Sequence, residues 1–226
     1  MADTPRHALY YAPPATHPLW RAGCAWLGRD PADPDDLRAP PPERGAPWRY
    51  GFHATLKPPM RLLDHGEAAL LAAIEALAAA TPAFAMPALE VAPLSDFLAL
   101  RPRAALAREH PLWRLADACV RELDAWRAPP DAAETARRRA PGSDAEQLAL
   151  LARWGYPHVL QRWRFHLTLS DRAPSAALAD AARQHFAAAL AVPLRCEELC
   201  LFVEPAPGAP FRLRRRFRLA AASGAR

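Results

Sequence analysis

An eight-residue pattern occurs twice in this chain, and its two histidines are 113 positions apart. Residues 49–56 read RYGFHATL and residues 162–169 read RWRFHLTL, so arginine, an aromatic residue, phenylalanine, histidine, threonine and leucine coincide in order. A chance match of this length is improbable, and such a repeat indicates duplication or internal pseudo-symmetry. The chain is therefore expected to form two similar halves, each supplying one copy.

The residues around the two copies predict strands alternating with helices, which indicates the α+β class. The order is β-α-β-α-β-β before about residue 105 and α-α-β-α-β-β after it. Thr16 is the expected N-cap of the first helix, and Ser143 with Glu146 forms a predicted capping box for the fourth. Helices are expected at 18–27, 67–80, 111–126, 143–154 and 175–190, strands at 7–12, 50–57, 83–91, 97–101, 163–169, 194–203 and 211–219, and loops at 29–47 and 127–142.

Both copies are predicted to be strands with one apolar and one polar face, because successive side chains of a strand point to opposite sides. The polar faces contain no carboxylate before Asp171. They consist of His53, Thr55 and Lys57 in the first copy and of Arg164, His166, Thr168 and Ser170 in the second.

These polar groups suit the cleavage of a phosphodiester. A neutral imidazole can take a proton from the attacking oxygen while an imidazolium protonates the leaving oxygen. Threonine hydroxyls can donate hydrogen bonds to the non-bridging oxygens, and a cation can stabilise the charge that develops on them. The predicted catalytic residues are His53 and His166, and the predicted substrate-binding residues are Thr55, Thr168, Lys57 and Arg164.

The motifs FHATL and FHLTL resemble those of the 2H phosphoesterase superfamily, which includes the LigT-like RNA 2′,3′-cyclic phosphodiesterases. Over almost the full length, the segments RYGFHATLKPP, ARWGYPHV, RWRFHLTL and LFVEPAPGAPFRL resemble more closely a bacterial branch, the DUF1045 family, whose members are described in connection with phosphonate metabolism. The resemblance implies that His53 and His166 are catalytic without metal and that Thr55 and Thr168 bind phosphate.

The same resemblance implies the architecture. It predicts an α+β fold of two pseudo-symmetric lobes with antiparallel sheets around a central cleft. Residues 1–226 are expected to form one two-lobed domain, with halves at roughly 1–105 and 106–226 and interleaved strands.

Composition adds little to the choice of substrate. The net charge of +5 suits an anionic ligand or a nucleic acid. However, Lys57 is the single lysine beside 28 arginines, a skew that indicates coding bias more simply than a binding surface.

Several common motifs are missing from the sequence, which narrows the class of protein that it can encode. Neither copy of the motif has a second metal-ligand residue at suitable spacing, so we expect no metal and no cofactor. No GxxxxGK[ST] or GxGxxG motif occurs. The N-terminus lacks a signal-peptide pattern and the longest apolar stretch, 68–80, contains Glu75, so a cytoplasmic protein without a membrane span and with reduced cysteines is expected.

Two other functions stay open. A non-catalytic nucleotide- or RNA-binding module would use the same cleft and bind with steep salt dependence, and a scaffold in a phosphonate-handling complex would need neither histidine. Histidines in both copies favour catalysis, because binding alone needs no acid–base pair. The expected partner is a small phosphorylated substrate, or alternatively RNA or a nucleotide, and the oligomeric state is open.

Some residues near the motifs are weaker candidates. Ser170 ends the second polar face, and Tyr156 and His158 precede the second motif closely enough to line the cleft. Tyr10 and Tyr11 belong to an expected inner strand, where core packing is favoured over stacking on a base or ribose. Which histidine is the acid and which the base is not decided by the sequence.

Overall fold

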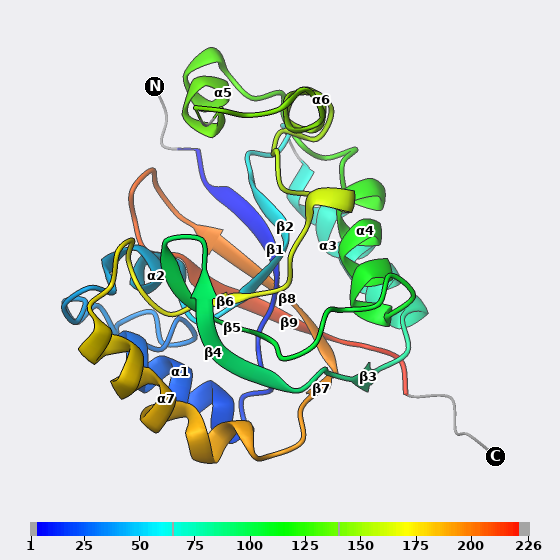
Figure 1. Cartoon of the computed structure of the whole chain (residues 1–226). Helices are drawn as coiled ribbons and strands as arrows, with labels where there is room; N and C mark the ends of the chain where they lie inside the picture. The colour runs from blue at the N-terminus through cyan, green and yellow to red at the C-terminus, as the bar shows by residue number, and fades with distance from the viewer. Residues whose placement is uncertain (1–3, 65, 140, 222–226) are drawn as a thin grey trace.

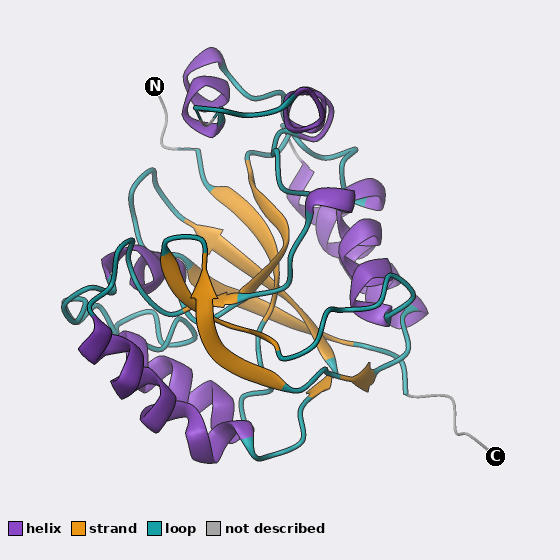
Figure 2. Cartoon of the chain, in the orientation of Figure 1, coloured by secondary structure: helices purple, strands orange, loops and turns teal. Residues whose placement is uncertain are grey.

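The computed structural model describes residues 4–64, 66–139 and 141–221, and its α+β architecture confirms the predicted class (Figure 1). Strands occupy the centre of the molecule and helices lie outside them (Figure 2). The strands are β1 (Arg6–Tyr11), β2 (Ala54–Met60), β3 (Phe84–Ala85), β4 (Leu89–Leu94), β5 (Phe97–Pro102), β6 (Leu167–Thr168), β7 (Arg195–Cys196), β8 (Glu198–Glu204) and β9 (Arg212–Arg218). The helices are α1 (Pro18–Leu27), α2 (Gly45–Tyr50), α3 (Gly66–Ala80), α4 (Pro111–Glu122), α5 (Ala132–Arg138), α6 (Ala145–Trp154), the 3₁₀-helix Leu160–Arg162 and α7 (Ala176–Leu190).

The two larger sheets each combine strands that are far apart in the sequence. One sheet has the order β2-β1-β8-β9 and the other the order β4-β5-β6, with antiparallel pairing throughout. A two-stranded pair, β3-β7, lies beside them. The strands that carry the repeated motif, β2 and β6, are both edge strands, and they contact each other. Each sheet thus has strands from both sides of residue 105, while the division into lobes at that point stays a prediction.

Helices cover the outer faces of the sheets. Helices α3 and α4 pack on the four-stranded sheet, α3 against β8 and β9 and α4 against β2. Helices α1 and α7 pack on each other, and α7 packs on β4 (Figure 1). Helix α4 shows why: its buried residues recur at helical spacing, so one apolar stripe faces the sheet. No helix in the described part of the chain is both long and apolar enough to cross a membrane.

The first copy of the motif forms a shorter strand than predicted. Residues up to Tyr50 belong to helix α2, which Gly51 ends with a positive φ of 81°. A Cβ at Gly51 would lie 2.8 Å from Pro31, so glycine is required there. The strand starts at Ala54 and continues to Met60 through two prolines, which an edge strand tolerates because one side of it needs no hydrogen-bond donors.

Other predicted boundaries also shift. The second copy contains only Leu167–Thr168 as strand, and the predicted strand at 83–91 divides into β3 and the start of β4. Helix α1 is capped by the His17 side chain instead of Thr16, and the capping box of α6 is formed by Asp144 and Gln147 instead of Ser143 and Glu146. The predicted loop 127–142 contains α5, with residue 140 outside the described residues.

Lys57 does not lie on the predicted face. Thr55 of β2 pairs with Tyr10 of β1, and Lys57 pairs with Leu9. Between these two pairs β2 moves on by two residues while β1 moves by one, so β2 has one extra residue. Such a bulge breaks the alternation of side chains and turns Lys57 to the side of the sheet opposite Thr55. There its ammonium donates to the Val120 carbonyl at 3.1 Å. The prediction that Lys57 binds substrate is therefore wrong.

The ion pair between Lys57 and Asp124 yields a stability prediction. The ammonium is 3.0 Å from Asp124 Oδ1, and the Lys57 side chain is 2% exposed. Asp124→Ala would leave a buried, uncompensated charge and is expected to lower the free energy of unfolding by about 3–5 kcal/mol. Lys57→Met should cost less, because Asp124 keeps its hydrogen bonds from Arg127.

Urea unfolding of the two variants measures this difference. The matched control is Asp180→Ala, which breaks an exposed pair with Arg183 and should change the free energy of unfolding by less than about 1 kcal/mol. Equal stability of Asp124→Ala and the wild type would contradict the importance of the buried pair.

Candidate active site

His53 lies in the turn between helix α2 and strand β2. Its Nδ1 is 2.8 Å from the carbonyl oxygen of Gly51, and its Nε2 is 3.2 Å from Thr55 Oγ1. The ring stacks on Tyr10, with ring centroids 3.7 Å apart. Three contacts from different directions therefore hold this imidazole in one orientation.

His166 has the equivalent backbone contact. Its Nδ1 is 2.8 Å from the carbonyl oxygen of Arg164, again two residues earlier in the chain. A carbonyl oxygen only accepts hydrogen bonds, so Nδ1 carries the proton in His53 and in His166. In the neutral rings Nε2 is then the free base, which is the atom that proton transfer needs. The duplication thus extends from the sequence to the tautomer of the two histidines.

The surroundings favour the neutral form of both histidines. Burial, together with the charge of nearby His166, lowers the pKa of His53 to about 4 against the hydrogen bond to Gly51, which raises it. Burial also lowers the pKa of His166, with the charges of His158 and Arg164 acting in the same direction. No carboxylate contributes to either pKa shift. An imidazolium at this site would therefore be stabilised mainly by an incoming anion.

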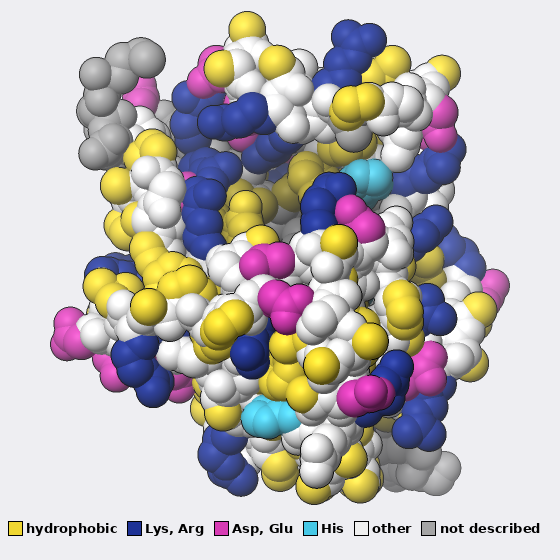
Figure 3. All heavy atoms as spheres, turned by 60° about the vertical axis from the view of Figure 1, so that its left-hand side comes forward, with side chains coloured by type: hydrophobic (Ala, Val, Ile, Leu, Met, Phe, Trp, Pro, Cys, Tyr) yellow, Lys and Arg dark blue, Asp and Glu magenta, His cyan; other side chains and the backbone are white. Residues whose placement is uncertain are grey.

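A cavity of about 800 Å³ joins the two motifs. Thr55 and His166 line it together, and so do Tyr156, His158 and Arg164. Tyr156 and His158, which the sequence left undecided, thus belong to the cavity wall. One face of the molecule is visibly hollowed, with Arg and His side chains at the rim of the hollow (Figure 3).

A direct hydrogen bond ties the two copies together. Trp163 Nε1 donates to the carbonyl oxygen of Thr55 at 2.7 Å. Trp163 is 4% exposed, so this bond is shielded from water. It fixes the edge of β2 against the segment that leads into β6, and with it the relative position of His53 and His166.

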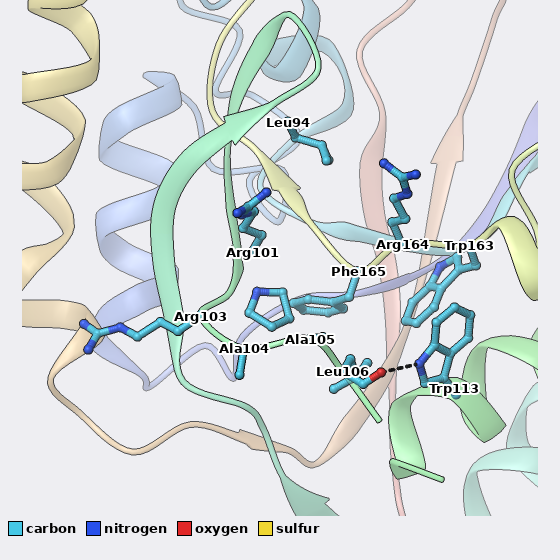
Figure 4. Close-up of a pocket in the computed structure, with 11 residues that line it drawn as sticks. Leu94, Arg101, Arg103, Ala104, Ala105, Leu106, Trp113, Trp163, Arg164 and Phe165 are labelled. Carbon is cyan, nitrogen blue, oxygen red and sulfur yellow. Dashed lines mark hydrogen bonds between the residues drawn. The ribbon is translucent and has the colours of Figure 1, made fainter. Parts of the chain in front are cut away.

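Arg164 stands between this cavity and a second one of about 420 Å³. Trp113, Trp163 and Phe165 provide aromatic walls for the smaller cavity, and Arg101 and Arg164 lie on either side of Phe165 (Figure 4). The exposed Arg164 side chain has no hydrogen-bond or ion-pair partner in the described part of the chain. It is therefore available to an anion in either cavity.

The remaining residues of the second polar face, Thr168 and Ser170, do not line the large cavity as His166 does. Thr168 is half-buried in β6 opposite Ala99, and it is not among the residues that line the large cavity. Ser170 is buried, donates to the Asp171 carbonyl and accepts from Leu98 N, so its role is structural. The Asp171 carboxylate accepts from two amides at the start of α2. The second polar face therefore contributes no free carboxylate to the site.

Metal-ligand clusters and reactive thiols do not occur at the site. Residues 4–64, 66–139 and 141–221 contain no group of three or more His, Cys, Asp or Glu side chains arranged to hold a metal ion. The four cysteines are free, and burial raises the pKa of Cys119 and of Cys200 to about 12. These thiols stay protonated near neutral pH and are poor nucleophiles.

Two site features went unrecognised in the sequence. Tyr50 belongs to the repeated pattern, but its place on α2 brings it within 6.1 Å of His53, measured between ring centroids. Arg6 stands at the start of β1, where only strand alternation with Tyr10 could have indicated that it shares the face of the site.

Residues 55–212 match the model of the DUF1045 family, which is described as a protein of unknown function. The chain is 42% identical over 224 residues to a Janthinobacterium sp. (strain Marseille) protein named ribose 1,5-bisphosphate phosphokinase PhnN. It is 38% identical over 219 residues to a protein of the same name from Laribacter hongkongensis (strain HLHK9). The matches cover 91% and 92% of this chain but 49% and 50% of the relatives, so the chain spans about half their length.

Solved structures with a similar arrangement of elements include one described as a phosphoesterase. It is 14% identical, with 95% of this chain and 98% of that chain covered and a TM-score of 0.47. Another is E. coli LigT complexed with 3′-AMP, which is 17% identical, with 96% and 99% covered and a TM-score of 0.46.

The electrostatic coupling of the histidines can be measured directly. NMR titration of the imidazole resonances should give His53 a pKa of about 4 in the wild type. In His166→Ala the pKa of His53 should rise, because the neighbouring positive charge is removed. His185→Ala is the control, since that ring bonds to the Ala22 carbonyl where α7 meets α1. An unchanged pKa of His53 in His166→Ala would show that the two rings do not interact.

Proposed function

This chain belongs to the DUF1045 family, and we propose that it is a metal-independent phosphoesterase of the two-histidine type. Its substrate is a cyclic or linear phosphodiester on a small ribose-phosphate or nucleotide-like metabolite or an RNA end. The observation that carries the proposal is the matched pair His53 and His166, each with Nδ1 anchored to a backbone carbonyl at 2.8 Å. Two imidazoles whose unprotonated Nε2 atoms have no carboxylate partner suit acid–base work on an anion.

The curated relatives are named as kinases, and that name fits this proposal only if their kinase activity lies outside the part that this chain matches. This chain contains no GxxxxGK[ST] motif of the kind that cradles nucleotide phosphates. It also spans about half of those relatives. We therefore assign the named kinase activity to the half that this chain does not match. A ribose phosphate remains a suitable substrate class, and a role beside phosphonate metabolism is part of the proposal.

We assign His53, whose pKa is lowered to about 4 by burial, as the base that takes a proton from water, because it is neutral near pH 7. We assign His166 as the acid, which is stabilised in its protonated form by the bound anion. The water oxygen forms a bond to phosphorus as the bond to the leaving oxygen breaks, and the proton from His166 neutralises the leaving alkoxide. When substrate binds, the Thr55 hydroxyl turns from His53 Nε2 to a non-bridging oxygen, and Arg164 stabilises the negative charge there. The repeated motif assigns the same role to Thr168, which does not line the large cavity.

Kinetics on purified protein in excess EDTA tests the proposal. Suitable substrates are 2′,3′-cyclic nucleotides and cyclic ribose phosphates. His53→Ala and His166→Ala should each lower kcat about 10²- to 10⁴-fold, the usual contribution of one acid or base. His185→Ala, on α7, is the control.

Two results would count against the assignment. Wild-type turnover in both histidine variants would show that neither is acid or base. Salt-dependent binding of oligonucleotides without turnover of any substrate would indicate the nucleotide-binding module instead.

The pH dependence of kcat/KM follows from the same pKa values. The active form has neutral His53 and protonated His166. Activity should fall below about pH 4 as His53 gains a proton, and should fall again at a pH below 6.5 as His166 loses its proton. The profile is therefore a bell with its maximum on the acidic side. A plateau that extends above pH 8 would contradict the assignment of His166 as the acid.

A further inference from the structure

A second group of polar side chains lies on the same sheet face as the histidine site. In β1 the side chains of Arg6 and Tyr10 point the same way, because they are four residues apart. Tyr10 is the residue on which His53 stacks. Along a strand, four residues span about 13 Å, which leaves room for a sugar between an anion at the histidines and one beside Arg6.

The charges in this group do not balance. Arg6 and Arg49 both donate to the carboxylate of Glu204, the residue of β8 that faces Arg6. Glu204 is 1% exposed, whereas the side chains of Arg6 and Arg49 are 20% and 34% exposed. Two guanidinium groups thus share one carboxylate, and one positive charge is left on the side that solvent reaches.

The hydrogen-bonding capacity is also incomplete. The Nε of Arg49 is buried and has no hydrogen-bond partner in the part of the chain that the structure describes. A buried donor without a partner is costly, so its retention needs an explanation. The amide of Gly208 donates to Glu204 at 3.1 Å, so the carboxylate already has several donors.

Three tyrosines extend the group towards the histidines. The rings of Tyr10 and Tyr50 both lie beside Phe211, with centroids 6.3 and 5.0 Å from it. Burial raises the pKa of Tyr10, and the charges of Tyr50, Tyr156 and Arg6 all act on it. None of the three hydroxyls has a hydrogen-bond partner among residues 4–64, 66–139 and 141–221. The hydroxyls of the half-buried Tyr50 and Tyr156 are therefore free to donate to a ligand, whereas Tyr10 is 1% exposed and supports the ring of His53.

Tyr156 joins this group to the catalytic cavity, because it lines that cavity together with Thr55 and His166. Arg138, whose guanidinium lies 5.7 Å from the Tyr156 ring, is engaged by Glu134 and by the carbonyl of Pro59. Unlike the exposed donors of Arg6 and Arg49, Arg138 thus has its protein partners in place. Arg138 therefore fixes Tyr156, while Arg6 and Arg49 stay available.

We propose that Arg6, Arg49 and Tyr50, with the hydroxyl of Tyr156, form a second anion subsite. It binds a phosphate monoester that the substrate carries at a distance from the reacting phosphodiester. The inference rests on the proposed function and narrows its substrate class to compounds with two phosphate groups. The guanidinium pair supplies charge-assisted hydrogen bonds, and the phenols add donors without adding charge.

A pair of substrates that differ by one group tests the subsite. Adenosine 2′,3′-cyclic phosphate is compared with the same compound bearing a 5′-phosphate, by steady-state kinetics in EDTA. The 5′-phosphate should lower KM about tenfold or more, as expected for charge-assisted contacts. Arg49→Gln should abolish this advantage and leave kcat for the compound without the 5′-phosphate close to wild type. Glu204 keeps its bonds from Arg6 and Gly208 in that variant, so the fold is preserved.

Further variants separate charge from structure. Tyr50→Phe removes one hydroxyl and keeps the ring that packs on Phe211, so it should reduce the advantage of the 5′-phosphate without loss of stability. Arg183→Gln, at an exposed pair on α7, is the matched control and should keep the full advantage. Equal KM values for the two substrates in the wild type would overturn the proposal.

Direct binding distinguishes failure of the subsite from failure of the proposed function. Calorimetry with ribose 5-phosphate on the double variant His53→Ala, His166→Ala should show binding that Arg49→Gln weakens about tenfold. If that holds while no phosphodiester is hydrolysed, the subsite stands and the phosphoesterase proposal fails. A different outcome is that adenosine inhibits turnover as strongly as ribose 5-phosphate does. In that case the subsite recognises the base, and the second-phosphate proposal is wrong.

Discussion

The hydrogen bond from the Trp163 indole to the Thr55 carbonyl, 2.7 Å long, is the contact on which the candidate site depends. It joins β2, the edge strand of one sheet, to the segment that leads into β6, the edge strand of another. Edge strands have unpaired backbone groups that must find partners. Here the partner is a side chain of the other copy, so the same bond satisfies the edge of β2 and holds Thr55, which bonds to His53, at the cavity that His166 lines.

The lack of free carboxylates around the cavity in the described structure affects the protonation of the two histidines. The acidic side chains near the motifs are engaged by other groups: Asp171 by amides at the start of α2, and Asp124 by Lys57. Glu146, which lines the cavity, accepts from Gln161 and Arg162. The histidines therefore gain no charge partner from the protein, and burial lowers the pKa of both. A bound phosphate would be the missing counter-charge, so substrate binding and protonation of the acid are coupled. The site would then be fully charged only when it is occupied.

Lys57 and Arg6 show the strength and the limit of strand alternation. Alternation placed His53 and Thr55 on one face. The pairing of Thr55 with Tyr10, on which His53 stacks, agrees with this placement. It failed at Lys57 because a bulge in β2 adds one residue, and a bulge depends on how two strands meet. The same rule applied along β1, which pairs with β8 without a shift, puts Arg6 on the face of Tyr10. Alternation therefore predicts side-chain directions in the regular strand β1, but it does not predict them in the bulged strand β2.

The sequence by itself determined the α+β class, most helices to within a few residues, and the two histidines as a matched pair, because a repeated local pattern needs no tertiary information. Only the tertiary structure decided which side chains stand around them. Tyr50 belongs to helix α2, and Asp171 accepts hydrogen bonds at the N-terminus of that helix. Lys57 points away from the site and donates to the Val120 carbonyl. Each of these outcomes depends on contacts between residues far apart in the chain. Strand spacing says which residues alternate, but the partner across the sheet sets where each one points.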